Sequence, residues 1–211
     1  MPNISFVYEL LLEQVRHIDA IQFVVLFFGI TEVLLARANR ILLYPAGIIA
    51  TTLSVYSLFQ AQLYAESLLN VYYIVMSVYG WWYWVKKKND PPVKVAFTSK
   101  REWYITLAIV FGGCAILYVV LRSFTPSDVP LWDAAVSATA WAGMWLLARR
   151  KIENWILLNI SNAMAIPLLF QKELPLFALL TAFLFIVACV GYFDWIKIYR
   201  RENMATSIVN K

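Results

Sequence analysis

The stretch Ser77–Lys88, SVYGWWYWVKKK, decides the fold. An apolar segment runs into Gly80, continues into three Trp and a Tyr, and ends in three lysines. Trp and Tyr collect at membrane–water interfaces, and Lys and Arg collect on the cytoplasmic side of membrane-spanning helices. This pattern therefore predicts the cytoplasmic end of a transmembrane helix.

The same kind of helix end recurs in the second half of the chain, where Val190–Lys197 reads VGYFDWIK. The Gly, Trp and Lys at 80, 84 and 86 return at 191, 195 and 197, all with one constant offset. Phe-Gln at 59–60 returns at 170–171 with the same offset, whereas Leu-Leu-Ala-Arg at 34–37 returns at 146–149, one position later than that offset predicts. These matches predict two copies of one three-helix unit, with one gap that reconciles the two offsets.

The composition excludes a soluble protein. Of the 211 residues 62% are hydrophobic, and the mean hydropathy is +0.66. Only 15% are charged, against roughly 25% in a soluble domain. The net charge of +5 does not indicate nucleic-acid binding, because the basic residues stand beside apolar segments. Cys114 and Cys189 lie inside apolar segments, which favours neither disulfides nor a metal site.

Seven apolar segments are each close to the length of about 20 residues that crosses a bilayer. A short helix at 4–15 with one apolar face precedes them and is expected at the membrane surface. With the 86–88 lysines inside, all but three of the 18 Lys and Arg fall on the cytoplasmic side. The N-terminus is then outside and the C-terminus cytoplasmic. The predicted spans are 18–35, 41–59, 63–85, 103–121, 131–147, 152–170 and 174–196.

Because three is odd, the fourth span makes the two copies parallel. The predicted fold is an all-α integral membrane protein with seven transmembrane helices, arranged 3+1+3 as two parallel three-helix repeats. Such repeats occur in transporters, with the substrate site near the midplane between the halves. The predicted units are an interfacial segment (1–17), the first repeat (18–88), a polar loop plus linker helix (89–130), the second repeat (131–197) and a cytoplasmic tail (198–211).

Polar side chains at mid-span depth are costly and usually face a cavity or a partner. Asn159 and Asn162 are three residues apart and share a helix face, as do Asn70 and Tyr73. An Asn side chain both donates and accepts hydrogen bonds, which suits an amide or a ribose hydroxyl. Hydrogen bonding between packed helices is the alternative interpretation of each Asn.

Aromatic side chains are the second group of candidates. Trp141 and Trp145 share a helix face, and Trp141 lies near the middle of its span, where an indole offers a stacking surface for a flat, cationic ring. An interfacial belt is the alternative interpretation of Trp81 and Trp84. The candidate substrate-binding residues are Asn70, Tyr73, Trp81, Trp84, Trp141, Trp145, Asn159, Asn162, Gln60 and Asp194.

The chain offers little for catalysis or ion coupling. Glu32, Glu66, Asp133 and Asp194 stand near span ends, where we expect them to be solvated or paired. No catalytic motif or nucleophile–base pair is recognisable, so we expect no enzyme and no cofactor. No Lys or Arg lies at mid-span, which disfavours a phosphorylated substrate.

With Gly80-Trp81-Trp82-Tyr83-Trp84 closing the third helix, and Asn159 and Asn162 in the sixth, the whole chain resembles the PnuC vitamin transporters of bacteria. These share a fold with the SWEET sugar transporters. The resemblance implies import of nicotinamide riboside by facilitated diffusion, with cytoplasmic phosphorylation trapping the product. It also implies a homotrimer in the bacterial inner membrane.

Two alternatives remain open at this point. Related branches of the family carry thiamine or riboflavin, which are also flat heterocycles. A seven-helix receptor of the PQ-loop type would bind a ligand without moving it across the membrane.

Overall fold

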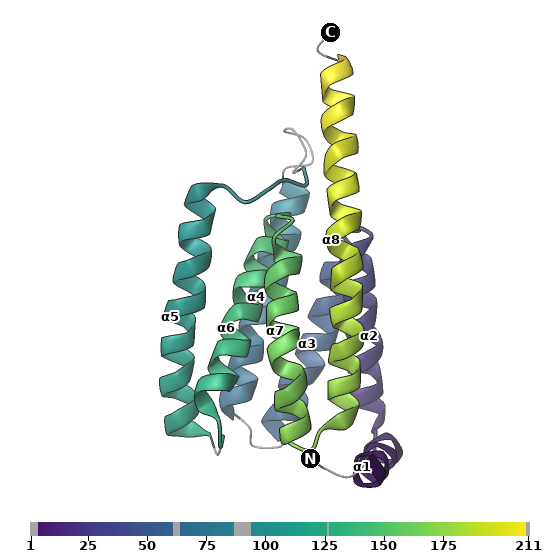
Figure 1. Cartoon of the computed structure of the whole chain (residues 1–211), viewed down its shortest axis with the longest axis vertical. Coiled ribbons are helices and arrows are strands. Elements are labelled where there is room, and N and C mark those ends of the chain that lie inside the picture. The colour runs from purple at the N-terminus through teal and green to yellow at the C-terminus, as the bar shows by residue number, and fades with distance from the viewer. Residues whose placement is uncertain (1–3, 61–63, 87–93, 126, 210–211) are drawn as a thin grey trace.

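The computed structural model describes residues 4–60, 64–86, 94–125 and 127–209, and within these it contains eight α-helices (Figure 1). The helix predicted at 4–15 is present as α1. The predicted polar loop at 89–92 and the turn after residue 60 fall largely outside the described residues. The helices are α1 (Ile4–Arg16), α2 (Ala20–Arg37), α3 (Leu43–Gln60), α4 (Tyr64–Lys86), α5 (Lys100–Phe124), α6 (Pro130–Ala148), α7 (Asn154–Gln171) and α8 (Pro175–Val209).

Six of the helices form a closed ring. In order, α2 packs on α3, α3 on α4, α4 on α6, α6 on α7, α7 on α8, and α8 returns to α2. Helix α5 packs mainly on α6 outside the ring, and α1 lies at the foot of the bundle beside α8 (Figure 1). Among the described residues, helices on opposite sides of the ring do not pack against each other. The space around the ring axis is therefore left to side chains and cavities.

The outer surface of the bundle is strongly apolar. Phe111, Tyr104 and Phe124 on α5 are each at least 70% exposed. Exposure of so much apolar surface to water is unfavourable, whereas lipid tails accept it. By length and composition, α2, α5 and the 175–204 part of α8 are able to cross a membrane. The chain is thus an all-helical membrane protein.

Two helix-ending turns align the halves of the chain. After α2, Asn39 has φ 54°, and the N–H groups of Asn39 and Arg40 donate to the carbonyls of Ala36 and Leu35, both at 2.9 Å. After α6, Arg150 has φ 57° and forms the same turn. There the N–H groups of residues 150 and 151 donate to the carbonyls of residues 147 and 146. This is the Schellman motif, in which a left-handed residue ends a helix.

These turns place the two halves in one register. Helices α3 and α7 begin at residues 43 and 154 and end at residues 60 and 171, and the same spacing separates the ends of α2 and α6 at residues 37 and 148. The predicted gap is therefore wrong, because the Leu-Leu-Ala-Arg match lies one residue away from the structural equivalence. Helix α8 also continues to Val209, so most of the predicted tail is an extension of the helix beyond the bundle (Figure 1).

An ion-pair cluster attaches α5 to the turn between α6 and α7. Ser99 and Glu102 form a capping box at the start of α5. The Glu102 carboxylate also pairs with Lys151 Nζ at 2.9 Å and with Arg149 Nη2 at 3.2 Å. These contacts hold α5 against the end of the bundle opposite α1.

Candidate functional site: a cavity inside the helix ring

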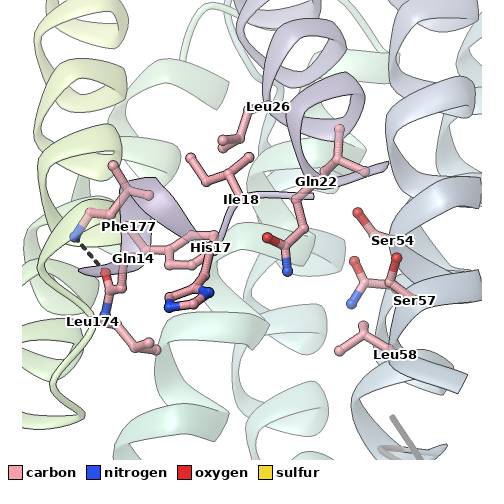
Figure 2. Close-up of a pocket in the computed structure, with 13 residues that line it drawn as sticks. Gln14, His17, Ile18, Gln22, Leu26, Ser54, Ser57, Leu58, Leu174 and Phe177 are labelled. Carbon is pink, nitrogen blue, oxygen red and sulfur yellow. Dashed lines mark hydrogen bonds between the residues drawn. The ribbon is translucent and has the colours of Figure 1, made fainter. Parts of the chain in front are cut away.

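A cavity of about 450 Å³ lies at the α1 end of the bundle (Figure 2). Residues of α2, α3, α4 and α8 line it, together with the end of α1. Because α4 and α8 are not neighbours in the ring, a cavity that both line must lie inside the ring. Its volume falls within the range of about 300–1,000 Å³ that is typical of small-molecule sites.

Neutral polar side chains provide most of the hydrogen-bonding capacity of this cavity. The Gln22 amide on α2 points toward Ser54 and Ser57 on α3 (Figure 2). Asn70 of α4 also lines the cavity, between apolar side chains such as Val25. Amides and hydroxyls both donate and accept hydrogen bonds, so this lining suits an uncharged polar group such as a carboxamide or a ribose.

Helix α1 covers one side of the cavity. Gln14 of α1 donates from Nε2 to the carbonyl of Glu173 at 2.8 Å and accepts at Oε1 from the N–H of Leu176 at 3.1 Å (Figure 2). Both partners belong to the turn and first residues of α8. Gln14 therefore fastens the end of α1 to the mouth of the ring, and His17 then faces the cavity.

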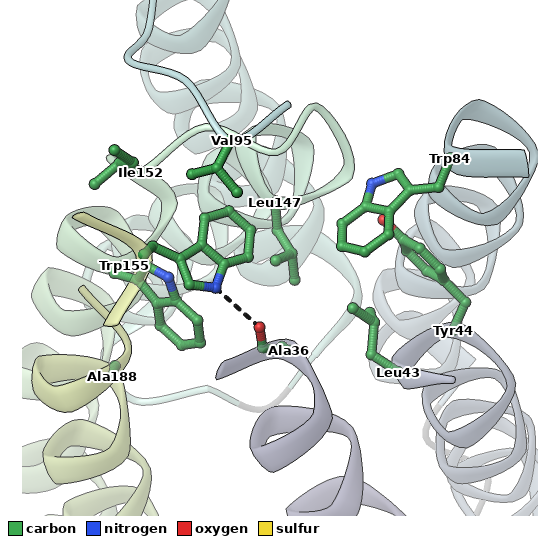
Figure 3. Close-up of a cluster of buried hydrophobic side chains, with 10 residues drawn as sticks. Ala36, Leu43, Tyr44, Trp84, Val95, Leu147, Ile152, Trp155 and Ala188 are labelled. Carbon is green, nitrogen blue, oxygen red and sulfur yellow. Dashed lines mark hydrogen bonds between the residues drawn. The ribbon is translucent and has the colours of Figure 1, made fainter. Parts of the chain in front are cut away.

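The opposite end of the ring is filled by a group of buried side chains, here named the aromatic cluster (Figure 3). Trp195 and Trp155 are at most 1% exposed. The Trp84 indole donates to the carbonyl of Ala148 at 3.1 Å, and the Trp195 indole donates to the carbonyl of Ala36 at 3.0 Å. Each bond joins one half of the chain to the other. The cluster comprises Ala36, Leu43, Tyr44, Trp84, Val95, Leu147, Ile152, Trp155, Ala188 and Trp195.

Each half of the chain contributes one edge-to-face ring pair to this cluster. Tyr44 and Trp84 meet with centroids 5.1 Å apart, and their equivalents in the second half, Trp155 and Trp195, meet at 5.7 Å. Edge-to-face packing is a favoured geometry for aromatic rings. Gly80 and Gly191 make room for these rings: a Cβ would lie 2.6 Å from Tyr44 Cζ in the first case and 2.8 Å from the Trp155 ring in the second. Close packing against an aromatic ring thus explains why glycine recurs at these two positions.

Charged groups complete this sealed end. Arg37 Nε lies 2.7 Å from Asp194 Oδ2, so the end of α2 is paired with α8. The Arg150 guanidinium lies 4.0 Å from the Trp84 ring centroid and donates to Asn39 Oδ1 at 2.9 Å. Burial lowers the pKa of Arg150 from its ordinary value. These contacts link the two halves at the end of the bundle from which α8 projects.

The residues expected to bind substrate are divided among several places. Asn70 lines the cavity, and Tyr73 follows one turn further along α4. Trp84 belongs to the aromatic cluster, and Asp194 is occupied by Arg37. Trp81 and Gln60 are exposed, and Gln60 donates to Tyr56 Oη at 3.0 Å within α3. Of these residues, Asn70 is the one that the structure places at the cavity wall.

Trp141 and Trp145 lie on α6, away from the cavity lining. Trp141 stacks on Tyr72 with ring centroids 4.4 Å apart, and the Tyr72 hydroxyl donates to the Trp141 carbonyl at 3.0 Å. Trp145 packs against a buried group that includes Leu146 and Leu157. In this conformation both indoles join helices to one another.

Asn159 and Asn162 lie on α7. Asn159 Nδ2 donates to Cys189 Sγ at 3.2 Å; with the amide rotated, it donates to the Phe185 carbonyl at 3.0 Å instead. Either arrangement joins α7 to α8, beside a shallow apolar pocket lined by the exposed Ile160. Asn162 is partly buried and does not line the cavity of Figure 2. A shared ligand for this pair remains a prediction.

Sequence reasoning missed part of the cavity wall. Gln22 and Ser57 were not among the candidates, although Gln22 is a polar residue early in an apolar span, and Ser54 and Ser57 are three residues apart. That spacing on one helix face was the available signal. The sequence does not reveal that α1 brings His17 to the same place.

The comparisons with known proteins agree on one family. The model of a family described as "Nicotinamide mononucleotide transporter" matches residues 19–197. A protein of Escherichia coli (strain K12) named "Nicotinamide riboside transporter PnuC" is 25% identical over 201 residues, covering 83% of this chain and 84% of that protein, and a Shigella flexneri protein of the same name matches equally. A solved structure titled "Crystal structure of the Vitamin B3 transporter PnuC" has a TM-score of 0.70 at 23% identity, covering 94% of this chain and 90% of that one.

Proposed function

Since the chain belongs to the nicotinamide mononucleotide transporter family, we propose that it is a membrane transporter that imports nicotinamide riboside. The riboside is the compound in the names of the curated relatives. Its carboxamide and ribose hydroxyls match the amide and hydroxyl groups of the cavity wall.

The composition of the cavity wall favours the riboside over the nucleotide as the substrate. Among the described residues no Lys or Arg lines the cavity, and His17 is its one titratable residue. Phosphate sites use Arg, Lys or helix N-termini to compensate the charge of the anion. The riboside lacks the phosphate, so a neutral polar wall is sufficient for it.

We further propose the 3+1+3 arrangement for this chain, with α2–α4 and α6–α8 as parallel repeats, α5 as the linker helix and α1 at the membrane surface. The offset shared by the ends of α2 and α6, both ends of α3 and α7, and the starts of α4 and α8 supports it. The distribution of Lys and Arg supports an outer N-terminus and a cytoplasmic C-terminus in the bacterial inner membrane. A homotrimer remains part of the proposal on the family resemblance.

In this orientation the cavity opens to the outside and the aromatic cluster closes the cytoplasmic end. Import then requires that the reciprocal indole bonds of Trp84 and Trp195 break while the α1 end closes, as in alternating access between two repeats. We propose facilitated diffusion without ion or ATP coupling, with phosphorylation in the cytoplasm retaining the product.

Uptake of labelled nicotinamide riboside into proteoliposomes tests the proposal, with and without a proton or sodium gradient. We expect saturable uptake that is indifferent to the gradient and is not competed by the nucleotide. Asn70→Ala should reduce uptake about tenfold, because a hydrogen bond to the substrate contributes about 1.5 kcal/mol. The exposed Gln60→Ala is the matched control and should behave like the wild type.

Three other outcomes would change the proposal. Entry of thiamine or riboflavin in place of the riboside would keep the architecture and change the substrate. Binding of a ligand without flux would favour a membrane receptor. Uptake that requires a gradient would replace facilitated diffusion by coupled transport.

A further inference from the structure

A carboxylate lies between the cavity and the aromatic cluster. Val25 of α2 lines the cavity, and Glu32 follows two helical turns, about 10 Å, further along the same face. On α4, Tyr73 and Ser77 follow Asn70 on one face in the same direction. A solute that moves along the ring axis from the cavity to the sealed end passes the depth at which these residues lie.

Glu32 has no partner in the described part of the chain. The residue is partly exposed, and among those residues it makes no ion pair and no hydrogen bond, so the pairing that was one of its two expected states is not seen. Two of the other acidic side chains that stand near predicted span ends do have partners: Asp194 pairs with Arg37 and Asp133 with Lys172. The side chain of Glu66 lies outside the described residues. A carboxylate inside a membrane protein is costly unless something compensates its charge. Its retention here points to a partner from outside the chain.

The neighbouring helix α3 leaves space for the Glu32 side chain. Gly47 of α3 leaves the space that the carboxylate occupies, since a Cβ there would lie 2.6 Å from Glu32 Cδ. Tyr44 of α3 and Tyr73 of α4 both interact electrostatically with Glu32. The Glu32 carboxylate therefore lies against α3 at Gly47, within electrostatic range of the Tyr44 and Tyr73 phenol groups.

Two buried hydroxyls nearby are also unsatisfied. Tyr44 Oη and Ser77 Oγ belong to residues that are each 1% exposed, and neither has a hydrogen-bond partner among the described residues. A Cβ at Gly80 would lie 2.6 Å from Tyr44 Oη, and Ser77 is one turn from Gly80 on the same helix face. Buried polar atoms are rarely left without a partner, so these two hydroxyls are free to bond to a ligand.

We propose that Glu32, Tyr44, Tyr73 and Ser77 form an inner binding site that selects the positively charged ring of the substrate. This inference rests on the proposed function and assigns Glu32 as its specificity determinant. A carboxylate attracts an organic cation through its charge, and nearby tyrosine rings add to that attraction wherever the cation reaches a ring face. The two hydroxyls supply hydrogen bonds to polar substituents.

A metal ion is a poorer occupant of this site. The described residues contain no group of three or more His, Cys, Asp or Glu that would hold one. The site is also confined to the first repeat. At the positions equivalent to Glu32 and Gly47, the second repeat has Gly143 and Leu158, and a Cβ at Gly143 would lie 2.9 Å from Leu158 Cγ. The Leu158 side chain thus fills the space in the second repeat, which has no carboxylate at the position equivalent to Glu32.

The test compares two substrates of similar size and different charge in proteoliposome uptake. Nicotinamide riboside is a cation, and its reduced dihydro form is neutral. We expect the wild type to prefer the cation and Glu32→Gln to lower uptake of the cation by about tenfold or more while sparing the neutral form, since contacts to a charged group contribute about 1.5–3 kcal/mol. Asp133→Asn, which removes a carboxylate outside this site, is the control and should keep the wild-type ratio.

Gly47→Ala provides a second variant that retains the charge. Its methyl group displaces the Glu32 carboxylate, so it should also lower the ratio of cation to neutral uptake. Gly47→Ala replaces Glu32→Gln in the test if gel filtration and thermal melting show that Glu32→Gln does not fold. An unchanged ratio in the folded variant would overturn the inference and leave the proposed function standing. Failure of the wild type to carry either riboside would instead overturn the proposed function.

Discussion

The helix triplets α2–α4 and α6–α8 have the same aromatic packing at the sealed end of the ring but different residues nearer its middle. At the sealed end each contains an edge-to-face aromatic pair, a glycine under the ring and an indole bond to the other triplet. Nearer the middle, Glu32 over Gly47 in the first triplet corresponds to Gly143 under Leu158 in the second. The closure is thus shared between the halves, whereas the charged group belongs to one of them.

The largest expected effect comes from breaking the shared closure. Trp195→Ala removes a fully buried indole and its bond to the Ala36 carbonyl, which keeps the bond from the Asn39 N–H. We expect it to lower the free energy of unfolding by about 3–5 kcal/mol, as for other buried aromatic truncations. Thermal melting in detergent measures this loss. Trp84→Ala should cost a similar amount, and a much smaller loss for either residue would show that one half alone maintains the closure.

The repeated glycine should tolerate substitution less well than a helical glycine with open space around it. Gly191→Ala places a methyl group against the Trp155 ring and should destabilise by about 1–3 kcal/mol through overpacking. Gly112 has nothing within 4 Å of a Cβ and is the matched control. Gly112→Ala should be neutral or stabilise by about 0.5–1 kcal/mol, because Ala favours a helix over Gly. Equal melting temperatures for the two variants would contradict the packing assigned to Gly191.

Exchanging the mid-depth pair tests the difference between the halves. The double variant Glu32→Gly with Gly47→Leu gives the first triplet the residues that the second has at 143 and 158. We expect a change in unfolding free energy below about 1.5 kcal/mol, since this replaces one filled space by another of similar size. Uptake of the cationic riboside should be lost. Preserved uptake in a folded double variant would mean that the charged group is not needed.

The smallest effect is expected at the Arg37–Asp194 ion pair. The two side chains are 41% and 28% exposed, and exposed pairs contribute about 0–1 kcal/mol. Asp194→Asn should therefore shift the melting temperature only slightly, and less in high salt than in low salt. A loss as large as that of Trp195→Ala would show that the pair, and not the indole bonds, dominates the closure.

Much of the fold was predictable because hydrophobic length and repeated letters are local properties. The interfacial stretch at 77–88 and its copy indicated repeated helix ends, and the family expected from these residues is confirmed by the family model. The register of the two halves was predicted less well. The Leu-Leu-Ala-Arg match is displaced by one residue from the alignment that the left-handed residues Asn39 and Arg150 give. The number of membrane spans remains a prediction.

The site was predictable only in part, because side-chain direction depends on the neighbouring helix. Asn70 was found from its spacing and lines the cavity, but Asn159, chosen on the same argument, faces α8. Glu32 was expected to be solvated or paired because it stands one turn from the predicted end of its span. In the structure it is packed against Gly47, which no pattern within α2 indicates.

The sequence by itself determined that this protein is helical, belongs in a membrane, has recurring helix-end motifs and belongs to one transporter family. Those properties follow from apolar run length, interfacial residues and repeated spacing, which act along a single helix. Only the tertiary structure decided which ends of the ring are open and closed, and which polar groups remain unsatisfied along its axis. Those properties arise where three or more helices meet, because a buried polar group is satisfied or not by neighbours that are distant in the chain.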